Sequence, residues 1–238
     1  MNPNSRVIVA LDVESSDRAA TLVAQLGAEA SFYKVGLQLL TAEGPSVVRQ
    51  LVAAGKRVFL DLKLFEIPNS VAGAVSAAGR LGVSMVTVHA SAGTAVLRAA
   101  VEAARPYPQL KVLALTVITS MRDQDLSEVG INAPVEEQVV RLARLAAQAG
   151  CHGVVASPQE ARLVRAVLPP ESLIVTPGTQ LPGEATNDQA RTATPAEAIG
   201  AGATHLVVGR SISRSADPAA SFAAICSQIA GRTSSVER

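Results

Sequence analysis

Short runs of aliphatic and β-branched residues alternate with alanine-rich segments from one end of this chain to the other. Eight such runs are predicted to be strands, at residues 7–11, 32–35, 58–62, 85–88, 112–116, 153–156, 173–176 and 205–208. Apolar residues recur at i, i+3 and i+4 in most of the intervening segments, which predicts helices at residues 16–26, 45–54, 69–81, 92–104, 135–149, 158–167, 195–201 and 218–230. A chain that repeats strand and helix in this way is limited to a parallel α/β fold.

The strands favour one particular α/β fold. They are continuously apolar, which is typical of parallel strands covered by helices, and eight strand–helix units with right-handed crossovers close into a (β/α)8 TIM barrel. The length of 238 residues is usual for one such domain, so we expect a single domain over residues 1–238. An open doubly wound sheet is the alternative. The pattern leaves it open, although no Gly-x-Gly-x-x-Gly motif follows the first strand.

The composition limits what the protein can bind. Hydrophobic residues make up 48% of the chain and aromatic residues 3%, so Ala, Val and Leu must fill a sizeable core. The formal net charge of +1 offers no basic face to nucleic acid, and we expect any bound anion to be small. The first residues lack the features of a signal peptide, and no apolar run reaches the roughly 18 residues of a membrane span. We expect a soluble, cytoplasmic protein.

Cysteine and histidine residues show no metal-binding pattern. Cys151 and Cys226 are isolated from each other and from other ligands, so we expect packed thiols. His89, His152 and His205 are dispersed, each in or beside an apolar run. We therefore expect no metal site.

Residues 57–70 carry the strongest signal for chemistry. An apolar strand runs directly into Asp61 and Lys63, with Glu66 three residues later and Ile67-Pro68 opening the next helix. Side chains alternate along a strand, so Asp61 and Lys63 are predicted to project from the same face. Charges at the end of a buried strand are costly unless they are paired. Taken alone, the segment is equally consistent with a solvated ion pair.

Polar residues also recur where the other predicted strands end. In a barrel these carboxyl ends meet at one face, and barrel enzymes keep their active residues there. The residues expected at this face are Asp12, Lys34, Asp61, Lys63, His89, Thr119, Ser120, Pro177, Gly178, Gly209 and Arg210. The opposite strand ends begin with residues such as Arg6, Lys111 and Ser172, where we expect an ordinary solvated rim.

The loops after the seventh and eighth strands form the usual phosphate site of barrels. Gly209 permits close approach of the backbone, and Arg210 can contact a phosphate through two N–H groups. The long loop at 177–194 carries Gly178, Gln180, Gln189 and Arg191. We expect this segment to be a mobile phosphate loop, and the tail at 232–238 to be disordered.

Seven motifs occur in order over residues 7 to about 218. They are Ala-Leu-Asp at the first strand, Lys-Val-Gly at the second, Asp-x-Lys-x-x-acid-Ile-Pro-Asn at the third, Val-His-Ala at the fourth, Thr-Ser-Met after the fifth, Thr-Pro-Gly after the seventh and Val-Gly-Arg after the eighth. Together they resemble the orotidine 5′-phosphate decarboxylase family. The resemblance implies decarboxylation of orotidine 5′-phosphate (OMP) to UMP and CO2, the last step of de novo pyrimidine synthesis, with no cofactor and no metal.

The resemblance also implies roles for the charged residues. Lys34, Asp61, Lys63 and Glu66 match the family's alternating charge network. Asp61 would crowd the substrate carboxylate, while Lys63 would stabilise the carbanion at C6 and protonate it. The family's second acid reaches into the neighbouring subunit's site, so Glu66 implies a homodimer.

Binding residues follow from the same resemblance. Asp12 and Lys34 would hold ribose hydroxyls, and Ser120 would meet the pyrimidine edge. Arg210 and Gln189 would bind the phosphate. Further substrate-binding positions are Ile67, Ser70, Thr119, Pro177, Gln180 and Gly209.

Three positions depart from the family pattern. Glu66 stands where Asp is usual, Gln180 where Arg is common, and Ser70 where Thr is usual. The extra methylene of Glu66 shifts its carboxylate by about 1–1.5 Å, and displacements near 1 Å can cost ~100-fold in rate. Two other functions stay open: a Mg-dependent sugar-phosphate decarboxylase or aldolase of the same superfamily, and a non-catalytic nucleotide-binding barrel.

Overall fold

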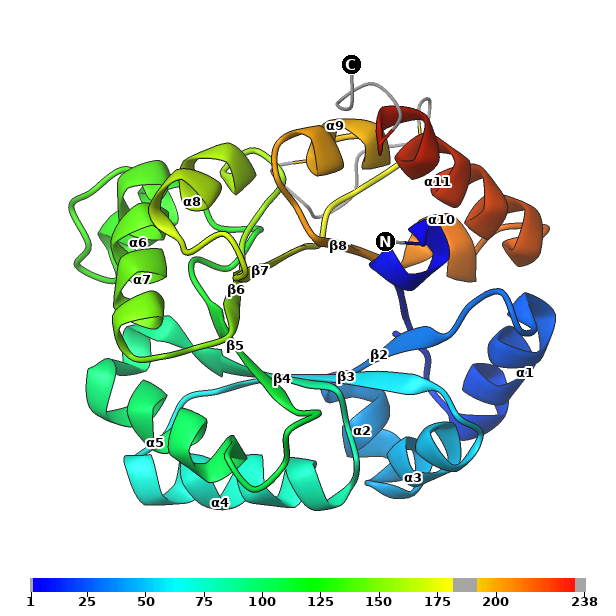
Figure 1. The fold of residues 1–238 in the computed structure, drawn as a ribbon, viewed down its shortest axis with the longest axis horizontal. Helices are drawn as coiled ribbons and strands as arrows, with labels where there is room; N and C mark the ends of the chain where they lie inside the picture. Colours follow the sequence, from blue (N-terminus) through cyan, green and yellow to red (C-terminus); the bar gives the residue numbers. More distant parts are fainter. Residues whose placement is uncertain (1, 182–191, 234–238) are drawn as a thin grey trace.

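Eight parallel strands close into a barrel in the computed structural model, which describes residues 2–181 and 192–233 (Figure 1). The strands are β1 (Val7–Ala10), β2 (Phe32–Gly36), β3 (Arg57–Leu64), β4 (Met85–His89), β5 (Lys111–Leu115), β6 (Gly153–Val155), β7 (Leu173–Thr176) and β8 (His205–Val208). The predicted (β/α)8 TIM barrel is confirmed. An open sheet is excluded, because β1 pairs with β8 as well as with β2.

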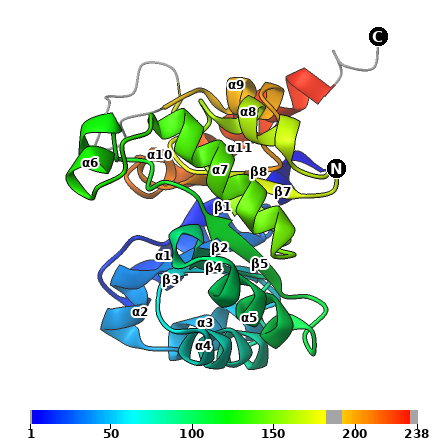
Figure 2. The ribbon, with the colours of Figure 1, turned by 90° about the vertical axis from the view of Figure 1, so that its left-hand side faces the viewer.

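Helices surround the barrel on its outer side (Figures 1 and 2). They are α1 (Ser16–Leu26), α2 (Leu37–Glu43), α3 (Ser46–Ala53), α4 (Pro68–Arg80), α5 (Thr94–Ala104), α6 (Asp123–Glu128), α7 (Val135–Gln148), α8 (Ala161–Val167), α9 (Pro195–Gly200), α10 (Arg210–Ser213) and α11 (Pro218–Thr233), with 3-10 turns η1 (Pro3–Arg6) and η2 (Ala90–Ala92). Within the described residues, none of these helices is long and apolar enough to cross a bilayer.

Three short helices, α2, α6 and α10, are not predicted by the sequence pattern. Each buries a single residue, Leu39, Leu126 and Ile212 respectively. A helix that buries only one side chain has no apolar periodicity to detect, which explains why these segments read as loops.

Two expectations about flexible segments concern residues that the structure mostly does not describe. Gln189 and Arg191 lie outside the described residues, as do most of the loop at 177–194 and most of the tail at 232–238. Residues 232–233 are described, and they form the end of α11.

Apolar side chains pack in two layers. One layer lies between the strands and the helices, where Ala, Val and Leu predominate. The other fills the inside of the barrel, with Ile8, Ala10, Phe32, Phe59, Met85, Leu113, Leu115, Val155, Val175 and Val207. The inside of the barrel is therefore a packed core, as is usual for this fold.

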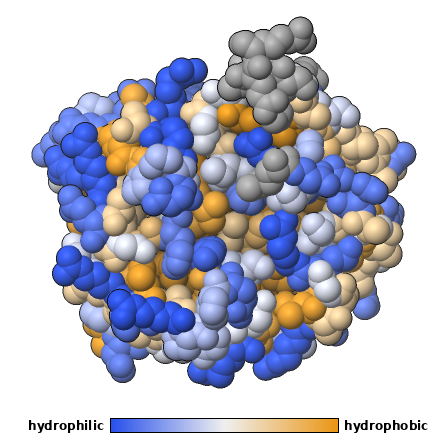
Figure 3. All heavy atoms as spheres, in the orientation of Figure 1, coloured by the Kyte–Doolittle hydropathy of each residue, from blue (hydrophilic) through white to orange (hydrophobic). Residues whose placement is uncertain are grey.

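The amino end of the barrel is closed by packing and capped by arginine, and Figures 1 and 3 view the molecule from this end. Arg6 donates to the carbonyls of Thr204 and Ala203 at 2.9 and 2.8 Å. The expected solvated rim is therefore wrong for Arg6, which is partly buried, and for Ser172, which is buried. In Figure 3 hydrophilic residues cover much of this face, and hydrophobic residues show between them.

Candidate active site

A cavity of about 520 Å³ opens at the carboxyl ends of the strands. It lies at the end opposite the N-terminus, on the side where Figure 2 shows α6 and α10. Its walls bring together eleven of the residues predicted for this face and its phosphate loop: Asp12, Lys34, Asp61, Lys63, Thr119, Ser120, Pro177, Gly178, Gln180, Gly209 and Arg210. Residues from six different strand ends therefore meet around one space, as the barrel argument predicts.

The charged side chains in this cavity form a chain of alternating sign. Lys34 Nζ lies 2.7 Å from Asp12 Oδ1 and 3.9 Å from Asp61 Oδ2. Lys63 Nζ lies 2.8 Å from the same Asp61 Oδ2. Asp61 is only 7% exposed and has an ammonium group on either side, so its burial is compensated in the way that buried charges require.

The backbone that carries Asp61 and Lys63 is not a regular strand. Leu60 pairs with Val86 and Leu64 with Val88, so the residues 61–63 face a single residue of β4. Lys63 has a φ of 51°, and no other non-glycine residue in the described chain has a positive φ. The left-handed conformation costs roughly 1–2 kcal/mol for such a residue, and strain of this kind collects at functional sites.

This irregularity corrects the sequence argument in one respect. Simple alternation predicts that Asp61 and Lys63 point to the same side of an ideal strand. The two side chains do meet, with their charged atoms 2.8 Å apart, but they do so across a bulged segment. Bulges are common beside active sites because they redirect a side chain.

Thr87 on β4 is a residue that sequence reasoning missed. Its hydroxyl donates to Asp61 Oδ1 at 2.8 Å and accepts from the backbone N–H of Lys63 at 2.9 Å. The side chain is fully buried. The signal available in the sequence is a lone hydroxyl residue in the middle of the apolar strand Met-Val-Thr-Val-His.

Gly36 at the end of β2 belongs to the Lys-Val-Gly motif, but the motif alone indicates no role for it. A Cβ at this position would lie 2.9 Å from Lys34 Nζ and 3.3 Å from Asp12 Oδ1. The first distance is shorter than real Cβ contacts, so the end of the Lys34 side chain would have to shift to make room for a side chain here. Glycine at this position leaves the ion pair of Lys34 and Asp12 undisturbed.

The histidines do not combine into a metal site. His89 lies beside the charged chain, where burial and then the charge of Lys63 lower the pKa of its ring. Its Nδ1 accepts from the N–H of Ser91. His152 and His205 belong to the amino ends of β6 and β8. Among residues 2–181 and 192–233, no group of three or more His, Cys, Asp or Glu side chains could hold a metal ion.

Glu66, Ile67 and Ser70 stand outside the cavity walls. Glu66 is fully exposed, and its pKa is lowered by a hydrogen bond from Ser70 and then by one from the Ile67 backbone. Its neighbours Phe65 and Ile67 are 64% and 62% exposed, although both are large and apolar. The described chain therefore does not bring these three predicted residues to the rest of the site.

One wall of the cavity is formed by the segments that follow the neighbouring strands β7 and β8. It contains Gly178, Thr179 and Gln180 after β7, and Gly209 and Arg210 after β8, where the short helix α10 begins. The Gln180 N–H donates to the carbonyl of Ala193 at 3.1 Å, which ties the two ends of the long loop together. Arg214, which no motif suggested, lines the same wall.

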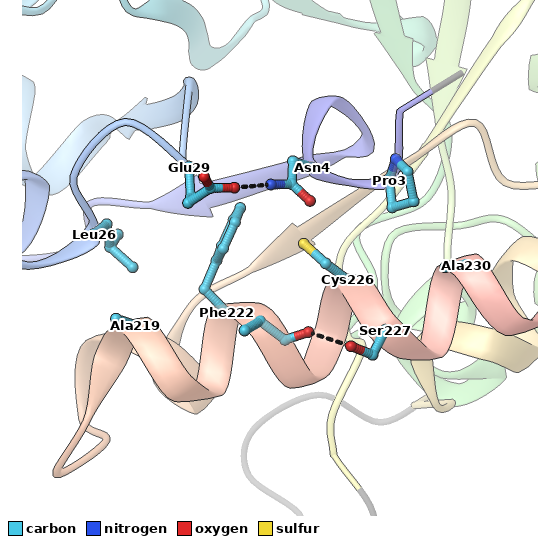
Figure 4. Close-up of a pocket in the computed structure, with 10 residues that line it drawn as sticks. Pro3, Asn4, Leu26, Glu29, Ala219, Phe222, Cys226, Ser227 and Ala230 are labelled. Carbon is cyan, nitrogen blue, oxygen red and sulfur yellow. Dashed lines mark hydrogen bonds between the residues drawn. The ribbon is translucent and has the colours of Figure 1, made fainter.

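A second cavity of about 340 Å³ lies between η1, α1 and α11 (Figure 4). Asn4 donates to Glu29 at 2.6 Å, while Phe222 and Cys226 of α11 line the apolar side. Burial raises the pKa of the Cys226 thiol to about 11, with a contribution from Glu29. Burial likewise raises that of Cys151 to about 12. Both cysteines are buried and free, which confirms the expected packed thiols.

Comparison with known proteins identifies relatives over nearly the whole chain. The model of the "Orotidine 5'-phosphate decarboxylase / HUMPS family" matches residues 5–225. An orotidine 5′-phosphate decarboxylase of Idiomarina loihiensis is 48% identical over 225 residues, covering 94% of this chain and 97% of that protein. One of Moorella thermoacetica is 47% identical over 236 residues, covering 96% and 94% respectively.

Solved structures agree with these relatives. The crystal structure of orotidine 5′-phosphate decarboxylase from Lactobacillus acidophilus is similar with a TM-score of 0.83 and 33% identity, covering 94% of this chain and 98% of that one. An uncharacterized conserved protein from Geobacillus kaustophilus is similar with a TM-score of 0.82 and 33% identity, covering 94% and 99%. The sugar-phosphate enzyme and the non-catalytic barrel gain no support from the relatives described above.

Proposed function

The chain belongs to the orotidine 5′-phosphate decarboxylase family, and from this premise we propose how its residues perform the reaction. The protein is a carboxy-lyase that decarboxylates OMP to UMP in pyrimidine biosynthesis. The observation that carries the mechanism is the alternating chain of Asp12, Lys34, Asp61 and Lys63 around the cavity. It supplies a fixed ammonium group where negative charge develops in this reaction.

Lys63 and Asp61 act on the reacting carbon. The bond between C6 and the carboxylate breaks, CO2 leaves, and the electron pair stays on C6 as a carbanion. The Lys63 ammonium stabilises that charge as it develops and then donates a proton to C6, giving UMP and a neutral lysine that regains its proton from solvent. Asp61 holds the ammonium through its 2.8 Å ion pair and repels the substrate carboxylate before it departs.

The rest of the cavity binds the nucleotide. Asp12 and Lys34 hold the ribose hydroxyls, and Ser120 beside Thr119 meets the pyrimidine edge. Arg210 and Gly209 bind the phosphate at the wall that follows β7 and β8, which also contains Pro177 and Gln180. Gln189 is proposed as a further phosphate ligand, although it lies outside the described residues. Binding energy from the remote phosphate can be used to orient the pyrimidine at Lys63.

We also propose that the enzyme is a homodimer with shared sites. Glu66 completes the neighbour's charge network, and Ile67 and Ser70 enter that site with it. Support comes from large apolar side chains that the single chain leaves exposed. Phe65 and Ile67, which flank Glu66 in the sequence, and Leu37 at the start of α2 are all more than half exposed. Large apolar groups left exposed in this way can mark an interaction surface.

The activity is tested by a spectrophotometric assay with OMP, with and without EDTA. We expect turnover that the chelator leaves unchanged. Loss of OMP turnover with EDTA, or turnover of a sugar phosphate instead, would favour the metal-dependent alternative. Tight UMP binding without any turnover would favour the non-catalytic barrel.

Shared sites are tested by complementation between two inactive variants, Lys63→Ala and Glu66→Gln. In a mixed dimer, one site keeps Lys63 and receives Glu66 from the other protomer. Random mixing should therefore restore about a quarter of the wild-type activity, since half of the symmetric dimers are mixed and each has one intact site. No recovery in mixtures that light scattering shows to be dimeric would contradict the sharing of Glu66.

A further inference from the structure

We propose that Thr87 is a positioning residue that sets the geometry of both Asp61 and Lys63 through a single hydroxyl group. The inference rests on the proposed roles of these two residues. Thr87 lies on β4, directly behind them, and does not belong to the cavity walls. It is fully buried, so it acts through its neighbours and not by touching the substrate.

The register of the sheet supports this role of Thr87. Three residues of β3, at 61–63, lie opposite one residue of β4, because Leu60 pairs with Val86 and Leu64 with Val88. The single residue opposite them is Thr87. A bulge disrupts the regular ladder, and here the N–H of Lys63 donates to Thr87 Oγ1 at 2.9 Å.

The backbone conformation of Lys63 also supports it. Its φ of 51° lies in the left-handed region, which a lysine adopts only where the surroundings hold it. The hydrogen bond from its N–H to Thr87 is one contact that holds it. Without this acceptor, we expect the backbone to relax and to carry the ammonium away from its position over the cavity.

The directions of the two hydrogen bonds of the Thr87 hydroxyl support it as well. A hydroxyl has one hydrogen, and that of Thr87 points to Asp61 Oδ1 at 2.8 Å, which leaves a lone pair for the Lys63 N–H. Asp61 is thereby anchored through Oδ1, and its other oxygen, Oδ2, faces the ammonium of Lys63 at 2.8 Å and that of Lys34 at 3.9 Å. One hydroxyl therefore fixes the plane of the carboxylate and the backbone of the lysine together.

The test compares four enzymes: wild type, Thr87→Val, Thr87→Ser and Thr87→Ala. Valine keeps the shape of threonine but has no hydroxyl, so we expect kcat to fall about 10- to 100-fold while KM for OMP changes less than about threefold. Serine restores the hydroxyl and should return kcat to within about threefold of wild type. The serine and alanine variants differ only in the hydroxyl, so this pair decides the question even if the valine variant does not fold.

A matched control removes a similar hydroxyl at the other end of the barrel. Thr204 directly precedes β8, and its hydroxyl accepts from Ile174 N–H and donates to Ile174 C=O, both at 3.0 Å. The same hydroxyl oxygen lies 3.0 Å from Nδ1 of His205. Thr204→Val should lower the melting temperature and leave kcat unchanged. An equal loss of kcat in this control would reduce Thr87 to a general structural role and overturn the proposal.

Two further results would also overturn it. One is a valine or alanine variant with wild-type kcat, and the other is a serine variant as slow as alanine. Lys63→Ala, assayed beside these variants, distinguishes failure of the positioning role of Thr87 from failure of the catalytic role of Lys63. If Lys63→Ala is inactive and Thr87→Val is fully active, only the positioning role fails. If Lys63→Ala keeps its activity, the proposed function of Lys63 fails first.

Discussion

The two ends of the barrel both carry basic residues, but they use them differently. At the amino end, Arg57 lies over the Phe32 ring at 4.2 Å and donates to the carbonyl of Ser5. Arg6 donates to the carbonyls at the start of β8. At the carboxyl end, Lys34 and Lys63 face the carboxylates of Asp12 and Asp61 around an open cavity.

The two ends differ in what their cations contact. Cations at the amino end satisfy backbone carbonyls and cover an aromatic ring, so they close the core. Burial lowers the pKa of both arginines, but arginine stays charged and has no proton to give at neutral pH. The carboxyl end instead presents lysines, which can donate a proton, with carboxylates that hold them. The presence of paired opposite charges beside a cavity distinguishes the functional end.

The strongest test of this comparison is Lys63→Ala. We expect activity to fall by at least about 10⁴-fold, because both electrostatic stabilisation and proton donation are lost. The melting temperature should change little, since the side chain is partly exposed. OMP turnover and thermal unfolding measure the two effects. Residual activity within about tenfold of wild type would remove Lys63 from the mechanism.

Arg210→Ala sharpens the assignment of the phosphate wall. We expect affinity for UMP to weaken about 10- to 100-fold, as for loss of a charge-assisted hydrogen bond, while affinity for uridine, which lacks the phosphate, stays the same. Arg214→Ala is the matched control on the same wall, and it should lower the affinity for UMP by a smaller factor. Titration calorimetry with both ligands measures the effect. Equal weakening for uridine would show that Arg210 does not act through the phosphate.

At the amino end, the corresponding prediction concerns stability and not rate. Burial, followed by the charges of Arg57 and Arg6, lowers the pKa of His205 to about 4. The unfolded chain therefore binds a proton at higher pH than the folded one. The neutral His205 ring makes its full contribution to the free energy of unfolding above about pH 6.5. As the pH falls toward 4, this contribution is lost, and the free energy of unfolding decreases by up to about 3 kcal/mol.

Replacing His205 by glutamine isolates this contribution. Glutamine cannot take up the proton, so His205→Gln should flatten the decline in the free energy of unfolding between about pH 6.5 and 4. Urea unfolding across this range measures it, and kcat at neutral pH should be unaffected. An equally steep decline in the variant would assign the acid sensitivity to other groups.

The smallest expected effect belongs to Glu66→Asp. This change restores the acid that is usual in the family, and we expect kcat to stay within about threefold of wild type or to rise. Aspartate and glutamate carry the same charge, so the variant keeps the carboxylate that the neighbouring site would receive. Steady-state kinetics with OMP provides the measurement. A collapse of activity would mean that the neighbouring site has adapted to the longer side chain.

Sequence alone predicted much of the fold and of the cavity. The eight strands were placed within about two residues at each end, because buried parallel strands are continuous apolar runs. Asp12, Lys34, Asp61 and Lys63 were placed correctly, since the carboxyl ends of barrel strands must meet.

What sequence could not reveal depends on the partners of each strand. The bulge at 61–63 exists only relative to the register of β4, so neither the positive φ of Lys63 nor the role of Thr87 follows from the local pattern. The close contact between a Cβ at Gly36 and Lys34 Nζ depends in the same way on the direction of the Lys34 side chain. The exposure of Phe65 and Ile67 likewise depends on how the folded chain packs around them, which the local sequence does not show.

Exchange of the C6 hydrogen of UMP in D2O tests directly whether Lys63 is the proton donor. If Lys63 protonates C6, then by reversal of that step the enzyme should slowly replace the C6 hydrogen of bound UMP with deuterium, which proton NMR detects as loss of the C6 signal. We predict exchange with wild type and none with Lys63→Ala at saturating UMP. Equal exchange in both enzymes would contradict the assignment of Lys63 as the proton donor.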